Sequence, residues 1–163
     1  MQRDRSLIPL SHQHQHALAL CVRLDRGLKS ATRTPAELEA WQVEIEQLFQ
    51  GEIRHHFEAE EKVLFPAARR RGGLRILVDE LLAEHMRLRA LAQGATARSL
   101  DAAGLQQFAD TLSTHIHKEE RQLFEQCQAL LSVAEMERLG GALEEYFKSS
   151  GMPGASCALR PQG

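Results

Sequence analysis

The sequence predicts an all-α protein, an up-down-up-down four-helix bundle followed by a short additional C-terminal helix. Apolar residues recur at intervals of three and four along most of the chain, and β-branched runs typical of strands are nearly absent. Capping signals and glycine-containing turns divide this pattern into long segments joined by short connections. Because short connections make consecutive helices antiparallel neighbours, four long helices in a row predict a bundle.

Length, composition and charge limit the class of protein. A chain of 163 residues fits one domain that can bury most of its apolar surface, and 43% hydrophobic with 26% charged residues is typical of soluble globular proteins. The net charge of −2, from 20 basic and 22 acidic residues, gives no electrostatic reason to expect nucleic acid or an anionic membrane as a partner.

Three further features bear on localisation. No run of about 20 apolar residues is present to span a bilayer, and the first residues, MQRDRSLIPLSHQHQH, lack the apolar core of a secretory signal. The three cysteines form no C-x-x-C motif, and one of them must remain unpaired, which is typical of free thiols in a reducing compartment. We therefore expect a cytoplasmic protein without a membrane partner.

The first helix is predicted from about Pro9 to Lys29. Its apolar stripe includes Leu10 and places His14 on the core face, whereas His12 and His16 fall away from that face. The run HQHQH can also be read in another register, so His12 and His16 stay as substitutes for His14 at this stage.

The second helix is predicted from Pro35 to about Arg71. Thr34 as N-cap and Glu37 three residues later form a capping box, and the pair Gly72-Gly73 ends the helix. Because proline removes a backbone donor, Pro66 is expected to kink the last turns.

The third and fourth helices each carry a histidine on the buried side. The third is predicted from about Leu74 to Ala97 and has His85 on its apolar stripe. After a short loop over Ser99–Gly104, the fourth helix places His115 and Glu119 in phase with its leucines and its phenylalanine.

A fifth helix begins at a second capping box, formed by Ser132 and Glu135, and the pair Gly140-Gly141 is expected to weaken its middle. The predicted domain therefore covers residues 1–148. Residues 149–163, SSGMPGASCALRPQG, have the composition of a disordered tail.

A repeated motif marks the second and fourth helices. His56 and Glu60 are four residues apart, as are His115 and Glu119, and residues at that spacing share one helix face with Cβ atoms about 5–6 Å apart. Each copy continues with a second glutamate and a Leu-Phe pair, and 59 positions separate the two copies. Two copies in matched context are far more specific than one.

The buried polar residues are predicted to meet at one level of the bundle. Counting about 1.5 Å per residue from the helix ends aligns His56, His85 and His115, and His14 joins them if the second helix overhangs the first. The full set is His14, His56, Glu60, His85, His115 and Glu119. Such groups need partners when they are taken out of water, and a metal supplies them.

The composition of this set indicates the metal. Six ligands exceed the four that satisfy a tetrahedral zinc ion, and mixed nitrogen and oxygen ligands suit iron or manganese. Two ions with two bridging carboxylates, two histidines on each ion and one bridging oxide or hydroxide give five bonds per ion. One position per ion then stays open for a small diatomic ligand.

These residues resemble the hemerythrin-like HHE cation-binding family. The resemblance covers about residues 7–131 and rests on the two His-x-x-x-Glu motifs with their Glu-x-x-Leu-Phe continuations, together with His14 and His85. It implies a four-helix bundle holding two iron ions, oxo- or hydroxo-bridged, with Glu60 and Glu119 as bridges and the four histidines as terminal ligands.

The sequence departs from one branch of that family. Oxygen-carrying hemerythrins have two histidines one turn apart on the third helix, whereas the residues one turn from His85 are Leu81 and Arg89. Four histidines and two glutamates are more similar to the di-iron proteins linked to iron-sulfur cluster repair and nitric oxide. Those proteins usually carry an additional N-terminal domain with a cysteine, and we expect no room for it here.

Three functional hypotheses follow, and all of them predict iron. The favoured one is a stand-alone protein that binds or senses oxygen or nitric oxide. The second is an enzyme or iron donor in the oxidative or nitrosative stress response, which reduces peroxide or nitric oxide or repairs iron-sulfur clusters. The third is a metal storage or scavenging bundle. Glu61 and Glu120 are expected to be solvated or to orient a ligand imidazole through its other nitrogen.

Overall fold

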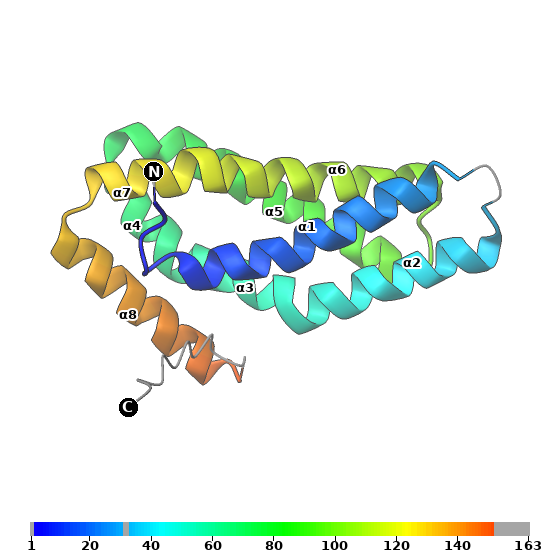
Figure 1. The fold of residues 1–163 in the computed structure, drawn as a ribbon, viewed down its shortest axis with the longest axis horizontal. Coiled ribbons are helices and arrows are strands. Elements are labelled where there is room, and N and C mark those ends of the chain that lie inside the picture. The colour runs from blue at the N-terminus through cyan, green and yellow to red at the C-terminus, as the bar shows by residue number, and fades with distance from the viewer. Residues whose placement is uncertain (1, 31–32, 152–163) are drawn as a thin grey trace, which may run out of the picture.

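The computed structural model describes residues 2–30 and 33–151, and within these ranges the chain forms helices and turns without a β-strand (Figure 1). The α-helices are α1 (Ile8–Leu28), α2 (Pro35–Leu48), α3 (Arg54–Ala59), α4 (Phe65–Arg69), α5 (Arg75–Thr96), α6 (Ala102–Lys118), α7 (Phe124–Leu130) and α8 (Val133–Ser149). The all-α prediction is confirmed. None of the described helices is long and apolar enough to cross a membrane.

Short π-helical segments join several of these helices end to end. They are η1 (Phe49–Ile53), η2 (Glu60–Leu64) and η4 (Glu119–Leu123). The predicted second helix is therefore a rod of alternating α and π geometry from α2 to α4, followed by the 3-10 turn η3 (Gly72–Leu74), and α6 continues through η4 into α7. Pro66 lies in the first turn of α4, directly after η2, where the helix changes from π to α geometry.

The rods pack side by side and α8 lies across one end (Figure 1). Helix α1 contacts α6 and η1, while α5 contacts α2, α4 and α6. Helix α8 contacts α3 and η2, so it covers the C-terminal half of the second rod.

Both predicted capping boxes are present. The backbone N–H of Glu37 donates to Oγ of Thr34 over 3.2 Å, and the Thr34 N–H donates to the Glu37 carboxylate over 2.7 Å. Ser132 and Glu135 form the same reciprocal pair at the start of α8, over 2.8 and 3.3 Å. Asp101 caps α6 through one bond, which its carboxylate accepts from the N–H of Gly104 over 2.8 Å; this cap was not among our predictions. These caps satisfy donors that a helix N-terminus leaves free.

Helix α8 is continuous through Gly140 and Gly141, where the sequence predicted a weak middle. A Cβ atom at Gly140 would lie 2.7 Å from Oγ of Ser6, so glycine here allows the N-terminal segment to approach the helix closely. Near its C-terminal end α8 is held by Tyr146, whose hydroxyl donates to the Glu58 carboxylate over 2.6 Å. Most of the predicted tail, residues 152–163, lies outside the described residues.

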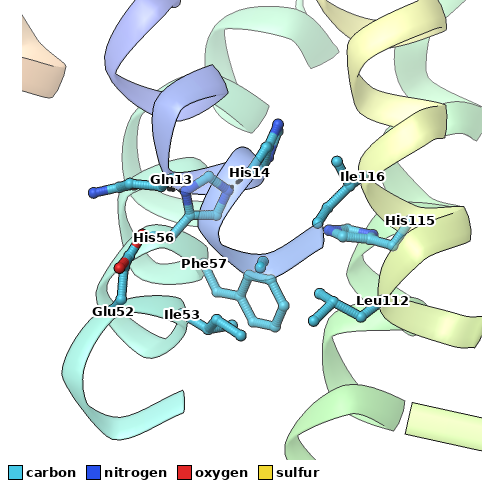
Figure 2. A pocket seen from close by; sticks show the side chains of 10 residues that line it. Gln13, His14, Glu52, Ile53, His56, Phe57, Leu112, His115 and Ile116 are labelled. Atoms are coloured by element: carbon cyan, nitrogen blue, oxygen red, sulfur yellow. Dashed lines mark hydrogen bonds between the residues drawn. The ribbon is translucent and has the colours of Figure 1, made fainter. Parts of the chain in front are cut away.

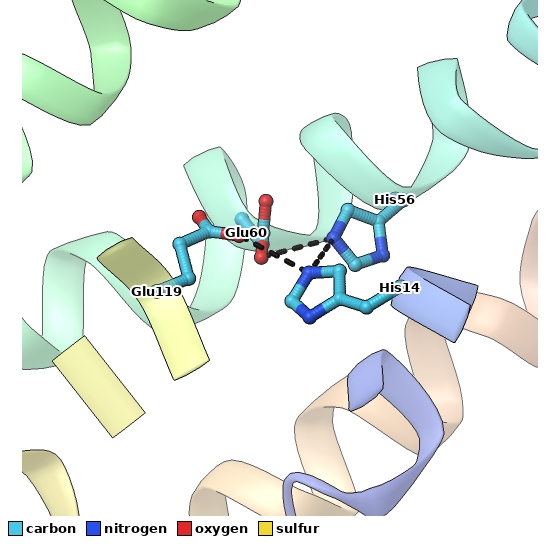
Figure 3. A group of neighbouring side chains, drawn as sticks. All are labelled: His14, His56, Glu60 and Glu119. Carbon is cyan, nitrogen blue, oxygen red and sulfur yellow. Dashed lines mark hydrogen bonds and ion pairs between the residues drawn. The ribbon is translucent and has the colours of Figure 1, made fainter. Parts of the chain in front are cut away.

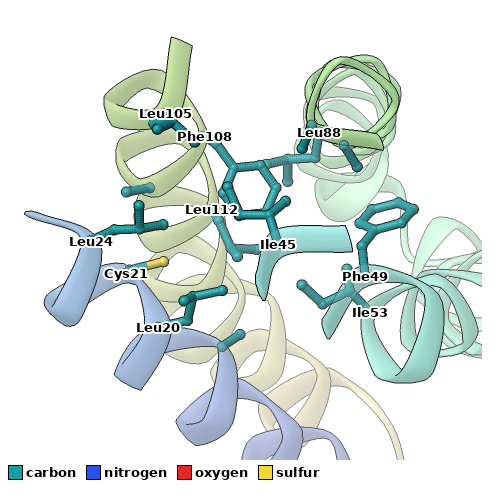
Figure 4. Packing of buried hydrophobic residues seen from close by; sticks show 14 of the residues in the cluster. Leu20, Cys21, Leu24, Ile45, Phe49, Ile53, Leu88, Leu105, Phe108 and Leu112 are labelled. Atoms are coloured by element: carbon teal, nitrogen blue, oxygen red, sulfur yellow. The ribbon is translucent and has the colours of Figure 1, made fainter. Parts of the chain in front are cut away.

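The apolar core consists of two clusters with a polar layer between them. One cluster includes Leu24, Ile45 and Phe108 (Figure 4), and the other includes Leu74 and Leu143. On each long helix the buried histidine stands between residues of the two clusters, as between Leu81 and Leu88 on α5. The bundle therefore holds its polar side chains at one level.

The buried cysteines belong to this core. Cys21 lies in the first cluster and Cys127 in the second, and both are free thiols. Burial raises the pKa of each thiol to about 12. Cys157 lies outside the residues that the structure describes.

Candidate metal centre

The structure brings all six predicted side chains into the polar layer. They come from α1 (His14), α3 (His56), η2 (Glu60), α5 (His85), α6 (His115) and η4 (Glu119). Both glutamates and His85 are fully buried, and the most exposed of the six, His56, is 4% exposed. The structure therefore brings the six side chains together, and metal binding by them stays a prediction.

Among the described residues, two groups of four side chains offer ligand atoms that all lie within 4.8 Å of one another. Glu60 and Glu119 belong to both groups, with His14 and His56 completing the first (Figure 3). His85 and His115 complete the second. Each group has two imidazole nitrogens and two carboxylates, which is a suitable donor set for a transition metal.

Each carboxylate reaches both groups. Oε1 of Glu60 lies 3.1 Å from Nε2 of His56, and its Oε2 lies 3.4 Å from Nε2 of His85. Glu119 repeats this arrangement, with Oε2 at 3.1 Å from Nε2 of His14 and Oε1 at 3.4 Å from Nε2 of His115. The two oxygens of each glutamate therefore face different histidine pairs, which is the orientation that a bridging carboxylate requires.

Both glutamates start a π-helical segment. The N–H of Phe65 donates to the carbonyl of Glu60, and the N–H of Phe124 donates to the carbonyl of Glu119, five residues back in each case. Single π turns inside α-helices are common at functional sites. The two sequence motifs thus share a π-helical turn as well as the spacing of histidine and glutamate.

The outer nitrogen of every histidine has a partner of its own. Nδ1 of His14 lies 2.7 Å from Glu120 and Nδ1 of His85 lies 2.8 Å from Glu61, as expected for these second glutamates. Because the outer nitrogen donates to a carboxylate, the neutral form of each ring has its lone pair on Nε2, directed at the centre of the layer. The outer partners thereby fix both the rotation and the tautomer of these rings.

The partners of the other two histidines were missed in the sequence. Nδ1 of His56 lies 2.7 Å from Oε1 of Gln13, and Nδ1 of His115 lies 2.9 Å from Oε2 of Glu84. Gln13 and Glu84 each directly precede a predicted ligand, His14 or His85, on a neighbouring helix. This position next to a predicted ligand is the one feature of the sequence from which their role could have been predicted.

Basic side chains hold the outer carboxylates in place. Arg89 lies 2.7 Å from Glu61, and Arg3 lies 2.5 Å from Glu120. Burial opposes ionisation of both glutamates, but the adjacent histidine and arginine outweigh it and lower each pKa to about 2. Lys118 contacts the third outer carboxylate, Glu84, at 2.5 Å. These carboxylates are therefore charged at neutral pH.

The inner groups also favour their charged forms. Burial lowers the pKa of His14, but the adjacent carboxylates of Glu119 and Glu120 outweigh burial and raise it to about 9. The pKa of His85 is raised to about 9 in the same way, against burial, by Glu60 and the glutamate at its outer nitrogen. Burial disfavours the Glu60 carboxylate, yet the neighbouring imidazoles hold its pKa well below its usual range. Protonated imidazoles and the Glu60 carboxylate thus balance one another's charge, and a cation that bound at Nε2 would displace the proton there.

The surroundings of the Glu60 and Glu119 carboxylate oxygens indicate whether the residues fit a metal. All four carboxylate oxygens of Glu60 and Glu119 are buried and have no hydrogen-bond partner among the described residues. Burying a carboxylate in this way costs several kcal/mol unless a positive charge lies against it. A cation within each group would contact oxygens of both glutamates and the two inward Nε2 atoms. The donor set therefore fits two bound cations.

A narrow pocket adjoins one side of the centre (Figure 2). His14, His56 and His115 line it together with Gln13 and Glu52, and its other lining residues are apolar and include Phe57. About 10 Å³ is open to the centre of a water molecule, which is room for about one water. Phe57 also stacks on His85, with ring centroids 3.7 Å apart and planes inclined by 13°.

The remaining histidines lie away from the centre. His12 and His16 are exposed, so neither replaces His14, and His16 pairs with Glu52 over 3.1 Å at the surface. His117 is exposed and His55 is half-buried.

Comparison with known proteins gives one family. The family model described as the Hemerythrin HHE cation binding domain matches residues 8–127. No curated protein and no solved structure matches the chain. The matched range runs from the start of α1 to Cys127 in α7, and it contains all six side chains of the centre. The chain therefore belongs to the hemerythrin HHE cation-binding family.

Proposed function

We propose that the protein is a non-haem di-iron protein that binds or senses oxygen or nitric oxide. The observation that carries this proposal is the sharing of Glu60 and Glu119 by two histidine pairs, since a carboxylate with one oxygen toward each pair suits two adjacent cations. The proposal includes the up-down-up-down order of the four rods, which agrees with their short connections.

Iron is favoured over zinc by the donor set. A single structural zinc is satisfied by four ligands, whereas six side chains are collected here. Imidazole with carboxylate is the ligand type of non-haem iron sites. His14, His56, Glu60 and Glu119 would hold one ion, and His85 with His115 would complete the second group. An oxide or hydroxide would complete the coordination of the two ions.

The chain's own residues prepare the site for a small ligand. Ferrous iron, when bound, supplies electrons and an open coordination position to oxygen or nitric oxide. The outer partners hold the imidazoles in place, so little reorganisation is needed when a ligand arrives. Phe57 and the other apolar side chains of the pocket exclude bulk water, and the space of about one water molecule suits a diatomic ligand.

Titration of the anaerobically reduced, iron-loaded protein tests this function. We expect an absorption band that appears with oxygen, disappears when oxygen is removed, and returns through repeated cycles with slow autoxidation. Nitric oxide should bind to the same form at the same stoichiometry. Sustained turnover of peroxide or nitric oxide would instead identify an enzyme. Rapid loss of iron to a chelator would identify a store. Either result would contradict a binding or sensing role.

A further inference from the structure

A groove on the outer surface of the bundle is separate from the metal centre. Helix α8 packs against α3 and η2, and the groove remains between the first half of α8 and the C-terminal end of the second rod. About 320 Å³ of it is open to the centre of a water molecule, a volume within the range of ligand sites in proteins. The groove therefore has room for side chains of another molecule.

Part of the groove lining is apolar. Val63 and Ala67 of the second rod face the groove together with Leu139 of α8. Pro66 and Ala142 also line it, and both are exposed to solvent. Covering adjacent apolar side chains removes them from water and is favourable. This part of the groove can thus bind apolar side chains of a partner.

The charged part of the lining is mainly basic. It consists of Lys62, Arg70, Arg71 and Arg138, with Glu135 as the one acidic side chain among the lining residues. The whole chain, in contrast, has a net charge of −2. Positive charge is therefore concentrated at this groove on a protein with a slight excess of acidic residues, and such a concentration attracts an anionic partner.

Two of these basic side chains have no acidic partner among the described residues. Glu135 pairs with Arg71 at 2.5 Å and joins the two sides of the groove. Arg70 and Arg138 are exposed, and their guanidinium groups form no hydrogen bond or ion pair within the part of the chain that the structure describes. Because a guanidinium group binds a carboxylate through two parallel N–H···O bonds, both are suited to carboxylates of a partner.

The spacing of the basic residues suits a helical partner. Lys62, Pro66 and Arg70 follow one another at intervals of four, so they share one face of the second rod. At a rise of about 1.5 Å per residue, Lys62 and Arg70 are roughly 12 Å apart, which is about two helical turns. Lys62 has only a surface ion pair with Glu58, at 3.7 Å, and such pairs contribute little.

The surroundings of the groove favour a protein partner over a small molecule. The groove is open to solvent along its length, whereas a small ligand is usually enclosed over most of its surface. Leu130 and Val133 are 47% and 77% exposed, and they lie beside Leu131 of the lining in the sequence. A protein that filled the groove could also cover these two side chains.

We propose that this groove is the docking site for an acidic amphipathic helix of a protein partner. The apolar side chains of that helix lie against the apolar part of the lining, and its carboxylates bind Lys62, Arg70 and Arg138. None of the groove residues is a predicted metal ligand, so the proposal does not depend on the function of the centre. The docked helix contacts η2, the segment that begins at Glu60.

Fluorescence anisotropy of a labelled synthetic peptide tests this proposal with the full chain. The peptide is a helix of about 12 residues with glutamates two turns apart and leucines between them, and a second peptide has glutamine in place of each glutamate. We expect one acidic peptide to bind per chain. The glutamine peptide should bind about tenfold more weakly, because the ion pairs with the groove are lost.

A charge variant of the protein tests the role of the two arginines. Arg70→Gln combined with Arg138→Gln should weaken binding of the acidic peptide about tenfold. Arg87→Gln combined with Arg121→Gln is the matched control, because it removes the same charge from two exposed positions outside the groove and should leave the affinity unchanged.

A steric variant tests the position of the peptide without changing the charge. Ala142→Trp should fill part of the groove and abolish binding. Ala90→Trp is its control, at an exposed position on α5 that does not line the groove, and should bind the peptide as the wild type does. Circular dichroism of every variant recognises a folding defect.

Three results would overturn the assignment. The first is an acidic peptide that binds no better than its glutamine counterpart, or that binds Ala142→Trp as tightly as the wild type. The second is dimerisation of the chain alone that Ala142→Trp abolishes, which would make a second copy the occupant. The third is binding of the chain to vesicles of anionic lipid that Ala142→Trp abolishes, which would make a membrane surface the occupant.

Discussion

Nε2 of His14 lies 3.0 Å from Nε2 of His56, although the two residues are 42 positions apart in the chain. The outer nitrogen of each ring also has a hydrogen-bond partner, which is Glu120 for His14 and Gln13 for His56. Both inner nitrogens are therefore directed at one point. His85 repeats this relationship with its own partner in the second group, over 3.1 Å. Two imidazoles held in this way form half of a coordination site, and the predictions below follow from such preorganisation.

Removal of an outer partner should weaken metal binding without touching a ligand. Glu84→Ala leaves Nδ1 of His115 without its acceptor, and loss of such a partner typically lowers metal affinity by roughly 10–100-fold. Glu80→Ala is the matched control, because Glu80 lies one turn away, is more exposed and also contacts Lys118, at 3.3 Å. Competition with a chromophoric chelator measures both. Equal affinities for the two variants would contradict a role for the outer carboxylate.

The adjacent glycines of α8 should respond oppositely to alanine. At Gly140 the added Cβ would meet Ser6 at 2.7–2.8 Å, so the N-terminal segment must shift and thermal unfolding should occur at lower temperature. At Gly141 nothing lies within 4 Å of the added atom, and alanine should stabilise the helix by about 0.5–1 kcal/mol. The same direction of change in both variants would show that Gly140 does not serve the contact with Ser6.

Docking of α8 should depend on pH through Tyr146 and Glu58. Burial and the bond to Glu58 raise the pKa of Tyr146 from 10.0 to about 12, so the stability from this bond is fully present below pH 10.0 and is lost as pH rises through 12. The hydrogen bond from Tyr146 lowers the pKa of Glu58 below 4.5, so stability is present above 4.5 and is lost as pH falls through the lowered value.

Thermal unfolding of wild type and Tyr146→Phe across pH measures this contribution. The difference in melting temperature between them should be largest near neutral pH and should shrink at both extremes. A difference that stays constant from acid to alkaline pH would show that the hydroxyl and Glu58 are not coupled.

The buried thiols should resist alkylation in the folded protein. Burial raises the pKa of Cys21 and Cys127 to about 12, so almost none of the reactive thiolate is present at pH 8. Iodoacetamide labelling followed by peptide mass spectrometry should modify both only after denaturation. Labelling of the native protein at the rate of the unfolded chain would mean that these helices open frequently.

The residues that converge were predictable because helical periodicity is a local property. The stripe that contains Leu10 selected His14 from three neighbouring histidines, and the structure buries His14 while His12 and His16 are exposed. The two capping boxes were predictable for the same reason, since each is complete within four residues.

The missed features depend on contacts between distant segments. Gln13 and Glu84 look like ordinary polar positions until the rotation of the facing helix brings His56 and His115 within hydrogen-bond distance. The fit of Gly140 depends on Ser6, at the other end of the chain. The π-helical segments that begin at the two glutamates could not be predicted from the sequence. A histidine and a glutamate four residues apart are equally compatible with an ordinary α-helix.

Metal analysis of protein produced in iron-replete cells, compared with the variant that combines His56→Ala and His115→Ala, tests the central claim most directly. Each of these histidines belongs to a different group of four, so the double variant removes one imidazole from each position. We predict two irons per wild-type chain and loss of both in the variant, with the helical circular dichroism retained. Full iron content in the variant, or fewer than two irons in the wild type, would contradict a di-iron centre built from these side chains.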